Sequence, residues 1–104
     1  MRRVVIESPL AGDTELNLAY ARRALADSLT RGEAPFASHL LYPQVLDDGD
    51  PTQRALGIAA GLAWQGIADR VVVYGDHGLS KGMREGIGNA RRLGIPVEFR
   101  YIES

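Results

Sequence analysis

The sequence predicts a three-layer α/β sandwich, in which helices cover both faces of a parallel sheet of about four strands. Short apolar runs alternate along the chain with longer stretches of helical periodicity. The run Val71–Val73 has no polar interruption, which is typical of a central parallel strand covered on both faces. With a length of 104 residues, the chain is expected to form a single domain over residues 1–104.

The first expected strand is Arg3 to Glu7, a β-branched run that stops at Ser8-Pro9. Asp13 is suited to cap the helix that follows, because its side chain can accept a backbone N–H of the first turn. The helical pattern continues from Thr14 to about Thr30, and Gly32 is well placed to end it. The stripe expected to face the sheet consists of Leu18, Ala21, Leu25 and Leu29.

A weaker strand is expected over Ala34 to Ser38, and a long connection over residues 39–49 follows it. The next helix is expected to start at Asp50-Pro51 and to run to about Ala68, because aspartate caps helices and proline suits their first turn. Gly57 and Gly61 would let this helix approach a neighbouring segment closely. The residues expected on its buried face are Ala55, Ile58, Ala59, Leu62 and Gly66.

The second half of the chain supplies two further strands and a third helix. The strand around Val71–Val73 is followed by Ser80, which is suited to cap the helix, and Pro96 to Tyr101 forms the last strand. The expected buried stripe of this helix is Met83, Ile87, Ala90 and Gly94. The resulting order is β-α-β-α-β-α-β. It favours right-handed parallel crossovers, as in flavodoxin-like and Rossmann-like folds.

Composition and charge exclude several classes of function. The formal net charge is −1 at pH 7, so we expect no affinity for a nucleic-acid polymer. The absence of cysteine excludes disulfides, thiol catalysis and cysteine-ligated metal. No segment approaches the roughly 20 apolar residues of a membrane span, and the first residues lack the apolar run of a signal peptide. We therefore expect a cytoplasmic protein that contacts no membrane and needs no cofactor.

Ligands of such sheets bind beyond the carboxyl ends of the strands, which selects the loops at residues 8–13, 38–50 and 75–82. Backbone N–H groups at the helix starts in the first and third loops can hold an oxygen-rich or anionic ligand. Asp76 follows the central strand, a position suited to acid/base work or to binding a sugar hydroxyl. The residues expected to contact a ligand are Ser8, Gly12, Asp13, Asn17, His39, Arg54, Ser80, Gly82 and Met83.

Several of these residues also have a purely structural explanation. Asp13 and Ser80 can serve as helix caps alone, and His39 can be a structural histidine. The run Asp47-Asp48-Gly49-Asp50 lacks the spacing of an EF-hand, so a solvated turn and a cap explain it without metal. Arg54 lies near a helix start, where a cation is unfavourable unless an acidic neighbour or an anionic ligand compensates it.

Six segments spread over nearly the whole chain carry a resemblance to a known family. They are Ser8–Asp13 with Asn17, Ala34–Leu40, Leu46–Asp48, Gln53–Gly57, Ser80–Arg84 and Leu93–Val97. Together they resemble a family of small phage and bacterial proteins related to nucleoside 2-deoxyribosyltransferases. The resemblance implies a site that holds a nucleoside or nucleotide. It also implies a homo-oligomer in which a neighbouring subunit completes each site.

In the transferases that this family resembles, a glutamate on the helix after the third loop attacks the anomeric carbon of the sugar. An aspartate there helps to protonate the departing base. Asp76 matches such an acid, but the position of the glutamate is Gly86 here, with Glu85 adjacent. One residue along a helix turns a side chain by about 100°. Either Glu85 reaches the sugar through an altered helix start, or the nucleophile is absent.

The leading hypothesis is a nucleoside- or nucleotide-binding protein of deoxyribosyltransferase type that cleaves or exchanges an N-glycosidic bond, with Glu85 and Asp76 as catalytic residues. An alternative is a non-catalytic phage protein that binds and sequesters an ADP-ribose-type nucleotide signal, which the glycine at position 86 favours. A third interpretation is a structural or protein-interaction domain without affinity for small molecules, since a fold does not by itself imply a function.

Overall fold

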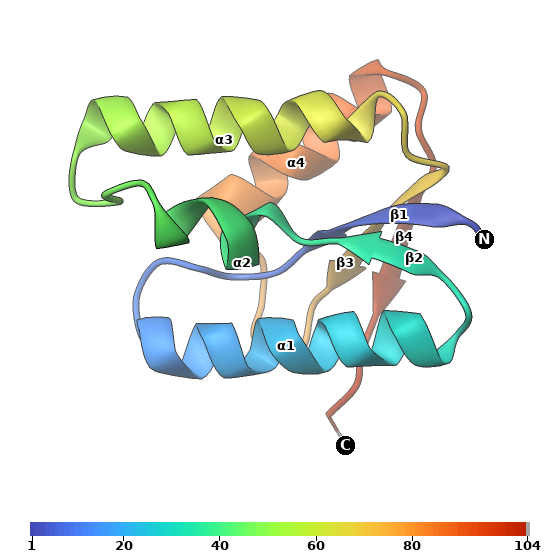
Figure 1. The fold of residues 1–104 in the computed structure, drawn as a ribbon. Helices are drawn as coiled ribbons and strands as arrows, with labels where there is room; N and C mark the ends of the chain where they lie inside the picture. The colour runs from blue at the N-terminus through green and yellow to red at the C-terminus, as the bar shows by residue number, and fades with distance from the viewer. Residues whose placement is uncertain (104) are drawn as a thin grey trace.

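The computed structural model describes residues 1–103 and confirms the predicted α/β sandwich (Figure 1). Its elements are β1 (Arg3–Glu7), α1 (Thr14–Thr30), β2 (Ala34–Phe36), α2 (Ser38–Leu41), the short 3-10 helix η1 (Tyr42–Gln44), α3 (Pro51–Gln65), β3 (Arg70–Tyr74), α4 (Lys81–Arg92) and β4 (Val97–Arg100). The four strands are parallel and lie in the order β2-β1-β3-β4. α1 lies on one side of the sheet, and α3 and α4 lie on the other. Within residues 1–103, no helix has the length and apolar character needed to span a bilayer.

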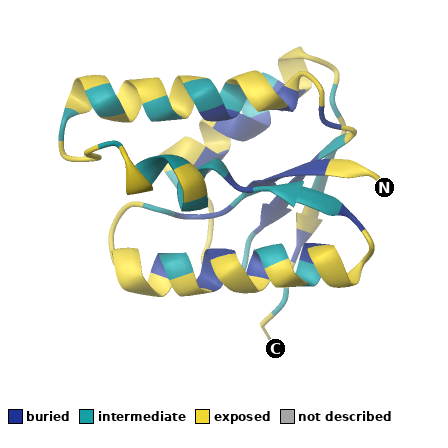
Figure 2. Cartoon of the chain, viewed as in Figure 1, coloured by how far each residue is buried: buried dark blue, intermediate teal, exposed yellow. Residues whose placement is uncertain are grey.

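The central strands β1 and β3 are buried on both faces (Figure 2). They pair with Val5 opposite Val71 and Ile6 opposite Val72. Because successive side chains of a strand point to opposite faces, each strand contributes to two cores. One core holds Val4, Ile6, Tyr20, Ala24, Ala37, Val72 and Tyr74, and the other holds Val5, Ala68, Val71, Val73, Met83, Ile87 and Ala90. This double burial explains why the run at residues 71–73 is apolar throughout.

α1 has the predicted bounds but turns a different face to the sheet. Asp13 caps it as predicted, accepting a backbone N–H at 3.1 Å. Of the predicted stripe only Ala21 is fully buried, because Leu18 and Leu25 are partly buried and Leu29 is 54% exposed. The buried residues are Asn17, Tyr20, Ala21, Ala24 and Ser28. The polar side chains in this set all have hydrogen-bond partners inside the protein, which compensates their burial.

The predicted buried face of α3 is wrong. The helix begins at Pro51 behind the Asp50 cap, as predicted, but it ends at Gln65 rather than near Ala68. Only Gly61 and Gln65 are buried within it. Of the residues expected to be buried, Leu62 is partly buried, and the exposed ones are Ala55, Ile58, Ala59 and Gly66. The reason is that α3 packs mainly against α2 and α4, and that it meets the strands near its end, where Trp64 contacts Phe36 and Gln65 contacts Glu7.

The connection predicted over residues 39–49 contains the short helices α2 and η1, and β2 ends at Phe36 because Ser38 already starts α2. The glycines of α3 face this segment, as their spacing predicted. A Cβ on Gly61 would lie 2.6 Å from Ser38 Oγ, and a Cβ on Gly57 would lie 3.2 Å from Leu46 Cδ1. The two glycines thus allow α2 and the following loop to lie directly against α3.

A buried ion-pair network joins β4 to the loop after α1. Arg100 donates from Nη1 to Glu33 Oε1 at 2.8 Å and from Nη2 to Glu33 Oε2 at 2.7 Å. Its Nε donates to Glu98, and its Nη1 also donates to Tyr74 Oη at 3.1 Å. Ser28 Oγ donates to Glu33 Oε1 at 2.8 Å. The Arg100 guanidinium lowers the pKa of Glu33 to about 2, despite the opposing effect of burial.

Candidate functional site

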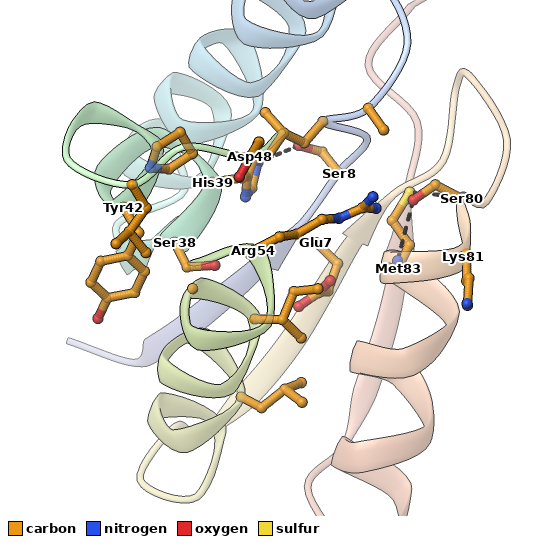
Figure 3. A pocket seen from close by; sticks show the side chains of 18 of the residues that line it. Glu7, Ser8, Ser38, His39, Tyr42, Asp48, Arg54, Ser80, Lys81 and Met83 are labelled. Carbon is orange, nitrogen blue, oxygen red and sulfur yellow. Dashed lines mark hydrogen bonds between the residues drawn. The ribbon is translucent and has the colours of Figure 1, made fainter. Parts of the chain in front are cut away.

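A cavity of about 310 Å³ opens at the carboxyl end of β1, beside the start of α4 (Figure 3). This is the edge of the sheet at which ligands of such folds bind. The walls come from the loop after β1, from α2 and η1, from α3 and from the first turn of α4. The volume lies at the lower end of the range of about 300–1,000 Å³ for small-molecule sites. It therefore suits one small ligand rather than an extended one.

Glu7, the last residue of β1, lines the cavity. Gln65 Nε2 donates a hydrogen bond to Glu7 Oε2 at 3.4 Å, and Asn89 Nδ2 donates to Gln65 Oε1 at 2.9 Å. Burial raises the pKa of Glu7 to about 7, although the hydrogen bond from Gln65 acts to lower it. The carboxyl group therefore changes its protonation state near neutral pH, where a catalytic acid or base is most effective.

The Glu7 carboxyl group has room only because residue 86 is glycine. A Cβ on Gly86 would lie 2.5 Å from Glu7 Cδ and 2.6 Å from each carboxylate oxygen. Such distances are far below the contact distance of about 3.5–4.0 Å between carbon atoms. The carboxyl group of Glu7 thus occupies the space into which any side chain at position 86 of α4 would project.

Ser8 and His39 form a neutral polar pair beside Glu7. Ser8 Oγ and His39 Nε2 lie 2.5 Å apart, and this contact links the loop after β1 to α2. Burial lowers the pKa of His39 to about 4, so its imidazole is uncharged at neutral pH. A serine hydroxyl paired with a neutral imidazole offers both a donor and an acceptor, which suits a ligand hydroxyl group.

Two cationic side chains, Arg54 from α3 and Lys81 from α4, also line the cavity (Figure 3). Within the described part of the chain, neither of them forms an ion pair. Ser80 caps α4, and its Oγ accepts the N–H of Met83 at 3.2 Å. The N–H groups of Lys81 and Gly82 lie at the positive end of the helix, without partners from its own backbone. Together these groups favour an anionic part of a ligand.

Apolar and aromatic side chains form the rest of the wall. They are Leu10, Ala11, Tyr42, Pro43, Leu46, Ile58 and Leu62. Trp64 lies outside the cavity and supports η1, because its Nε1 donates to Tyr42 Oη at 2.9 Å and its ring centroid lies 5.1 Å from that of Phe36. The wall therefore offers apolar surface to a flat ring in addition to its polar groups.

Six of the nine predicted ligand contacts line this cavity, namely Ser8, His39, Arg54, Ser80, Gly82 and Met83. The other three, Gly12, Asp13 and Asn17, do not line it. Gly12 has a φ of +99°, which suits glycine, and Asp13 caps α1. Asn17 Nδ2 donates to the carbonyl groups of Leu10 and Ala11, at 3.2 and 2.9 Å. Since Leu10 and Ala11 line the cavity, Asn17 shapes its wall indirectly.

The two residues predicted to be catalytic, Asp76 and Glu85, do not line the cavity. Asp76 Oδ1 accepts the hydroxyl of Tyr20 at 2.6 Å and the N–H of Ile102 at 2.9 Å, and Oδ2 accepts the N–H of Glu103 at 2.9 Å. Although burial acts to raise it, these hydrogen bonds lower the pKa of Asp76 to about 2. Asp76 therefore holds the segment after β4 as a carboxylate, while Glu85 is exposed on α4.

Six polar residues of the cavity were not among the predicted ligand contacts, which are Glu7, Thr14, Ser38, Tyr42, Asp48 and Lys81. The signal for Glu7 was present, because an acidic residue that ends a buried parallel strand lies at the ligand edge of the sheet. Lys81 lies between two residues that were predicted. Ser38 and Tyr42 lie in the predicted ligand loop 38–50, but they were not chosen as contacts because the helices α2 and η1, which orient them, were not predicted.

In the acidic run before α3, Asp47 stabilises a turn and Asp50 caps the helix. Asp47 Oδ1 accepts the N–H of Gly49 at 2.8 Å, and Asp50 Oδ1 accepts the N–H of Thr52 at 2.9 Å. Among residues 1–103, no group of three or more histidine and acidic side chains is placed so that it could hold a metal ion. These contacts account for Asp47 and Asp50 without a ligand.

A family model described as "Domain of unknown function (DUF7768)" matches residues 2–100. None of the curated proteins compared with the chain matches it significantly. Among solved structures, a 2-deoxyribosyltransferase from the psychrotolerant bacterium Bacillus psychrosaccharolyticus is similar, with a TM-score of 0.68 and 21% identity over 95% of this chain and 72% of that chain. A conserved protein from Enterococcus faecalis V583 gives a TM-score of 0.66 and 21% identity, over 100% of this chain and 65% of that chain.

At 21% identity, these likenesses show the fold alone. The first of them confirms the predicted resemblance to 2-deoxyribosyltransferases as a resemblance of fold. The chain spans less than two thirds of the E. faecalis protein, since it covers 65% of its length. Neither description mentions a phage protein or a nucleotide signal, so the predicted phage alternative has no support from them.

Proposed function

This chain belongs to the family described as Domain of unknown function (DUF7768), and we propose that it binds a nucleoside or a nucleoside monophosphate in the cavity at the carboxyl end of β1. The observation that carries the proposal is that three chemically different kinds of side chain line one cavity. A carboxyl group and a neutral Ser–His pair line the cavity, as do two cations that form no ion pair within residues 1–103 and several apolar side chains.

A nucleotide has three matching parts. Its sugar hydroxyl groups suit Glu7, Ser8 and His39, and its base suits the apolar wall that includes Ile58. Its phosphate suits Arg54 together with the first turn of α4. The volume of about 310 Å³ favours a single nucleoside unit over a dinucleotide. We propose that residues 1–104 make up this binding domain.

The proposed function includes cleavage or exchange of the N-glycosidic bond. The similar structure from B. psychrosaccharolyticus is a 2-deoxyribosyltransferase, an enzyme type that acts on this bond. In this chain the proposal is supported by an ionisable carboxyl group in the part of the cavity that suits the sugar.

The experiment that tests the proposal mixes the purified protein with a pool of nucleosides and nucleoside monophosphates. Ultrafiltration separates the retained from the free fraction, and mass spectrometry identifies the compounds in both. We expect retention of at least one nucleoside or nucleotide, together with the release of free base during longer incubation. Retention of none of these compounds at millimolar protein concentration would contradict the proposed function.

Arg54→Ala is expected to weaken the binding of a nucleoside monophosphate by about 10- to 100-fold, because a hydrogen bond to a charged group contributes about 1.5–3 kcal/mol. Binding of the corresponding nucleoside, which lacks the phosphate, is expected to change by less than about threefold. Isothermal titration calorimetry measures both affinities. Arg22→Ala, on the exposed face of α1, is the matched control and should change neither. An equal loss for nucleoside and nucleotide would remove Arg54 from the phosphate site.

A further inference from the structure

We infer that Glu7, at the end of β1, is the carboxylate that reacts with the anomeric carbon of the bound sugar, an inference that rests on the proposed function. The resemblance assigns this role to a glutamate at position 86 of α4, which is glycine in this chain. The structure places a different carboxyl group against that same position. The reactive group is therefore supplied by a strand and reaches across to the helix.

The evidence for this assignment is steric. The Glu7 carboxyl carbon lies 2.5 Å from the point at which a side chain on Gly86 would begin. The carboxyl group thus occupies the space beside α4 that a longer side chain at position 86 would otherwise use. It does so from a strand, because Glu7 is the last residue of β1, whereas position 86 belongs to α4.

A second observation is that the Glu7 carboxyl group is held in place. Gln65 is fully buried and bridges Asn89 of α4 to Glu7, with hydrogen bonds of 2.9 and 3.4 Å. Gln65 and Asn89 are positioning residues in this scheme, since neither of them lines the cavity. A reactive group needs such support, because small misplacements cost large factors in rate.

A third observation concerns the rival carboxylates. Within residues 1–103, the acidic side chains that line the cavity are Glu7 and Asp48. Asp48 is exposed in the loop before α3. Glu85 is exposed and outside the cavity. Glu7 is therefore the buried carboxyl group that a ligand in this cavity would meet.

The step is a substitution at carbon. An oxygen of the Glu7 carboxylate forms a bond to the anomeric carbon while the bond from that carbon to the base nitrogen breaks. The base leaves with the electron pair and takes a proton from water. A water molecule or a second base then attacks the glycosyl ester, which releases the sugar product and restores the carboxylate. With water, the net reaction converts the nucleoside into free sugar and free base.

The test traps the ester. The wild-type protein is incubated with nucleosides that carry fluorine on the carbon next to the anomeric carbon, because this substituent slows breakdown of the ester. Intact-protein mass spectrometry detects the added sugar, and peptide mapping locates it. We expect the sugar on Glu7 and its absence in Glu7→Gln. The Gln variant should also release base from unmodified nucleosides at least about 1,000-fold more slowly, while it still binds them.

Further variants make each outcome decisive. Glu15→Gln, on the exposed start of α1, is the matched control and should form the ester like the wild type. Base release by the wild type should rise with pH through about 7, because the ionised form of Glu7 is the nucleophile. A sugar attached to Glu85, or an ester that persists in Glu7→Gln, would overturn the assignment. Base release by Glu7→Gln at the wild-type rate would overturn the assignment and leave the proposed function intact. Binding without base release would contradict both the assignment and the proposed cleavage, and the absence of all binding would contradict the proposed binding as well.

Discussion

Replacing Glu33 with alanine is expected to lower the free energy of unfolding by about 3 kcal/mol, because the change leaves a buried guanidinium without its main partner. The Arg100 side chain is 5% exposed, and Glu33 binds both of its terminal nitrogen atoms. Glu98 remains as a partner for Nε but does not replace the lost pair. Urea unfolding of the wild type and of Glu33→Ala at pH 7 measures the difference.

The ion pair between Glu33 and Arg100 also predicts that the free energy of unfolding depends on pH. Arg100 lowers the pKa of Glu33 from its ordinary value of 4.5 to about 2, so the ionised form is favoured in the folded protein. The stabilisation is therefore complete above about pH 4.5 and is lost as the pH falls toward 2. The difference between the wild type and Glu33→Ala should shrink over the same range. Glu15→Ala removes an exposed carboxylate and should cost less than about 1 kcal/mol. An equal cost for both variants would show that the buried pair does not stabilise the fold.

Gly86→Ala is expected to slow base release by about 100-fold while leaving the protein folded. The added methyl group must displace the Glu7 carboxyl group, which is the far end of a flexible side chain and can move into the cavity. A displaced carboxyl group is better hydrated, so its pKa should fall from about 7 toward the ordinary value of 4.5. Carbon NMR titration of the Glu7 carboxyl group measures this shift without any assay of activity.

Gly88→Ala is the matched control for this substitution. Its Cβ would meet only Arg92 Nη1, at the ordinary contact distance of 3.5 Å, and it lies in the same helix. We expect unchanged base release and a slightly more stable protein, because alanine is a better helix former than glycine by about 1 kcal/mol. If Gly86→Ala left both the Glu7 titration and the rate of base release unchanged, the close approach of β1 and α4 would have no functional role.

The sheet and its helices could be predicted because each has a local cause in the sequence. The strand at 71–73 follows from an apolar run, and the caps at Asp13, Asp50 and Ser80 all form as predicted. The buried faces of α1 and α3 were not predictable from hydrophobic periodicity. The inward face of α3 carries Gly61 and Gln65. Their placement is explained by Ser38 for Gly61, and by Glu7 and Asn89 for Gln65.

The residues of the candidate site could also be predicted only in part. The rule that ligands bind at the carboxyl ends of parallel strands predicted Ser8, His39 and Ser80, because each lies next to a strand end or a helix start. It did not distinguish Asp76, which follows β3 but is held by Tyr20 and by the segment after β4. The side of the sheet on which a loop residue lies depends on contacts between segments far apart in the chain. Local sequence patterns do not predict these contacts.

The packing of α3 also has a consequence for how a ligand reaches the cavity. α3 packs mainly against α2 and α4, and between residues 38 and 65 it is Leu40 that packs against the two cores around β1 and β3. This segment is therefore held by fewer buried apolar contacts than the central strands. Regions with few buried contacts open locally at a lower free energy than the whole fold. Backbone amides of α3 should therefore exchange their hydrogens with solvent sooner than those of β3. Since this segment forms much of the cavity wall, the same opening that permits exchange would admit the ligand. A bound ligand would then hold this segment closed and slow the hydrogen exchange of its backbone amides.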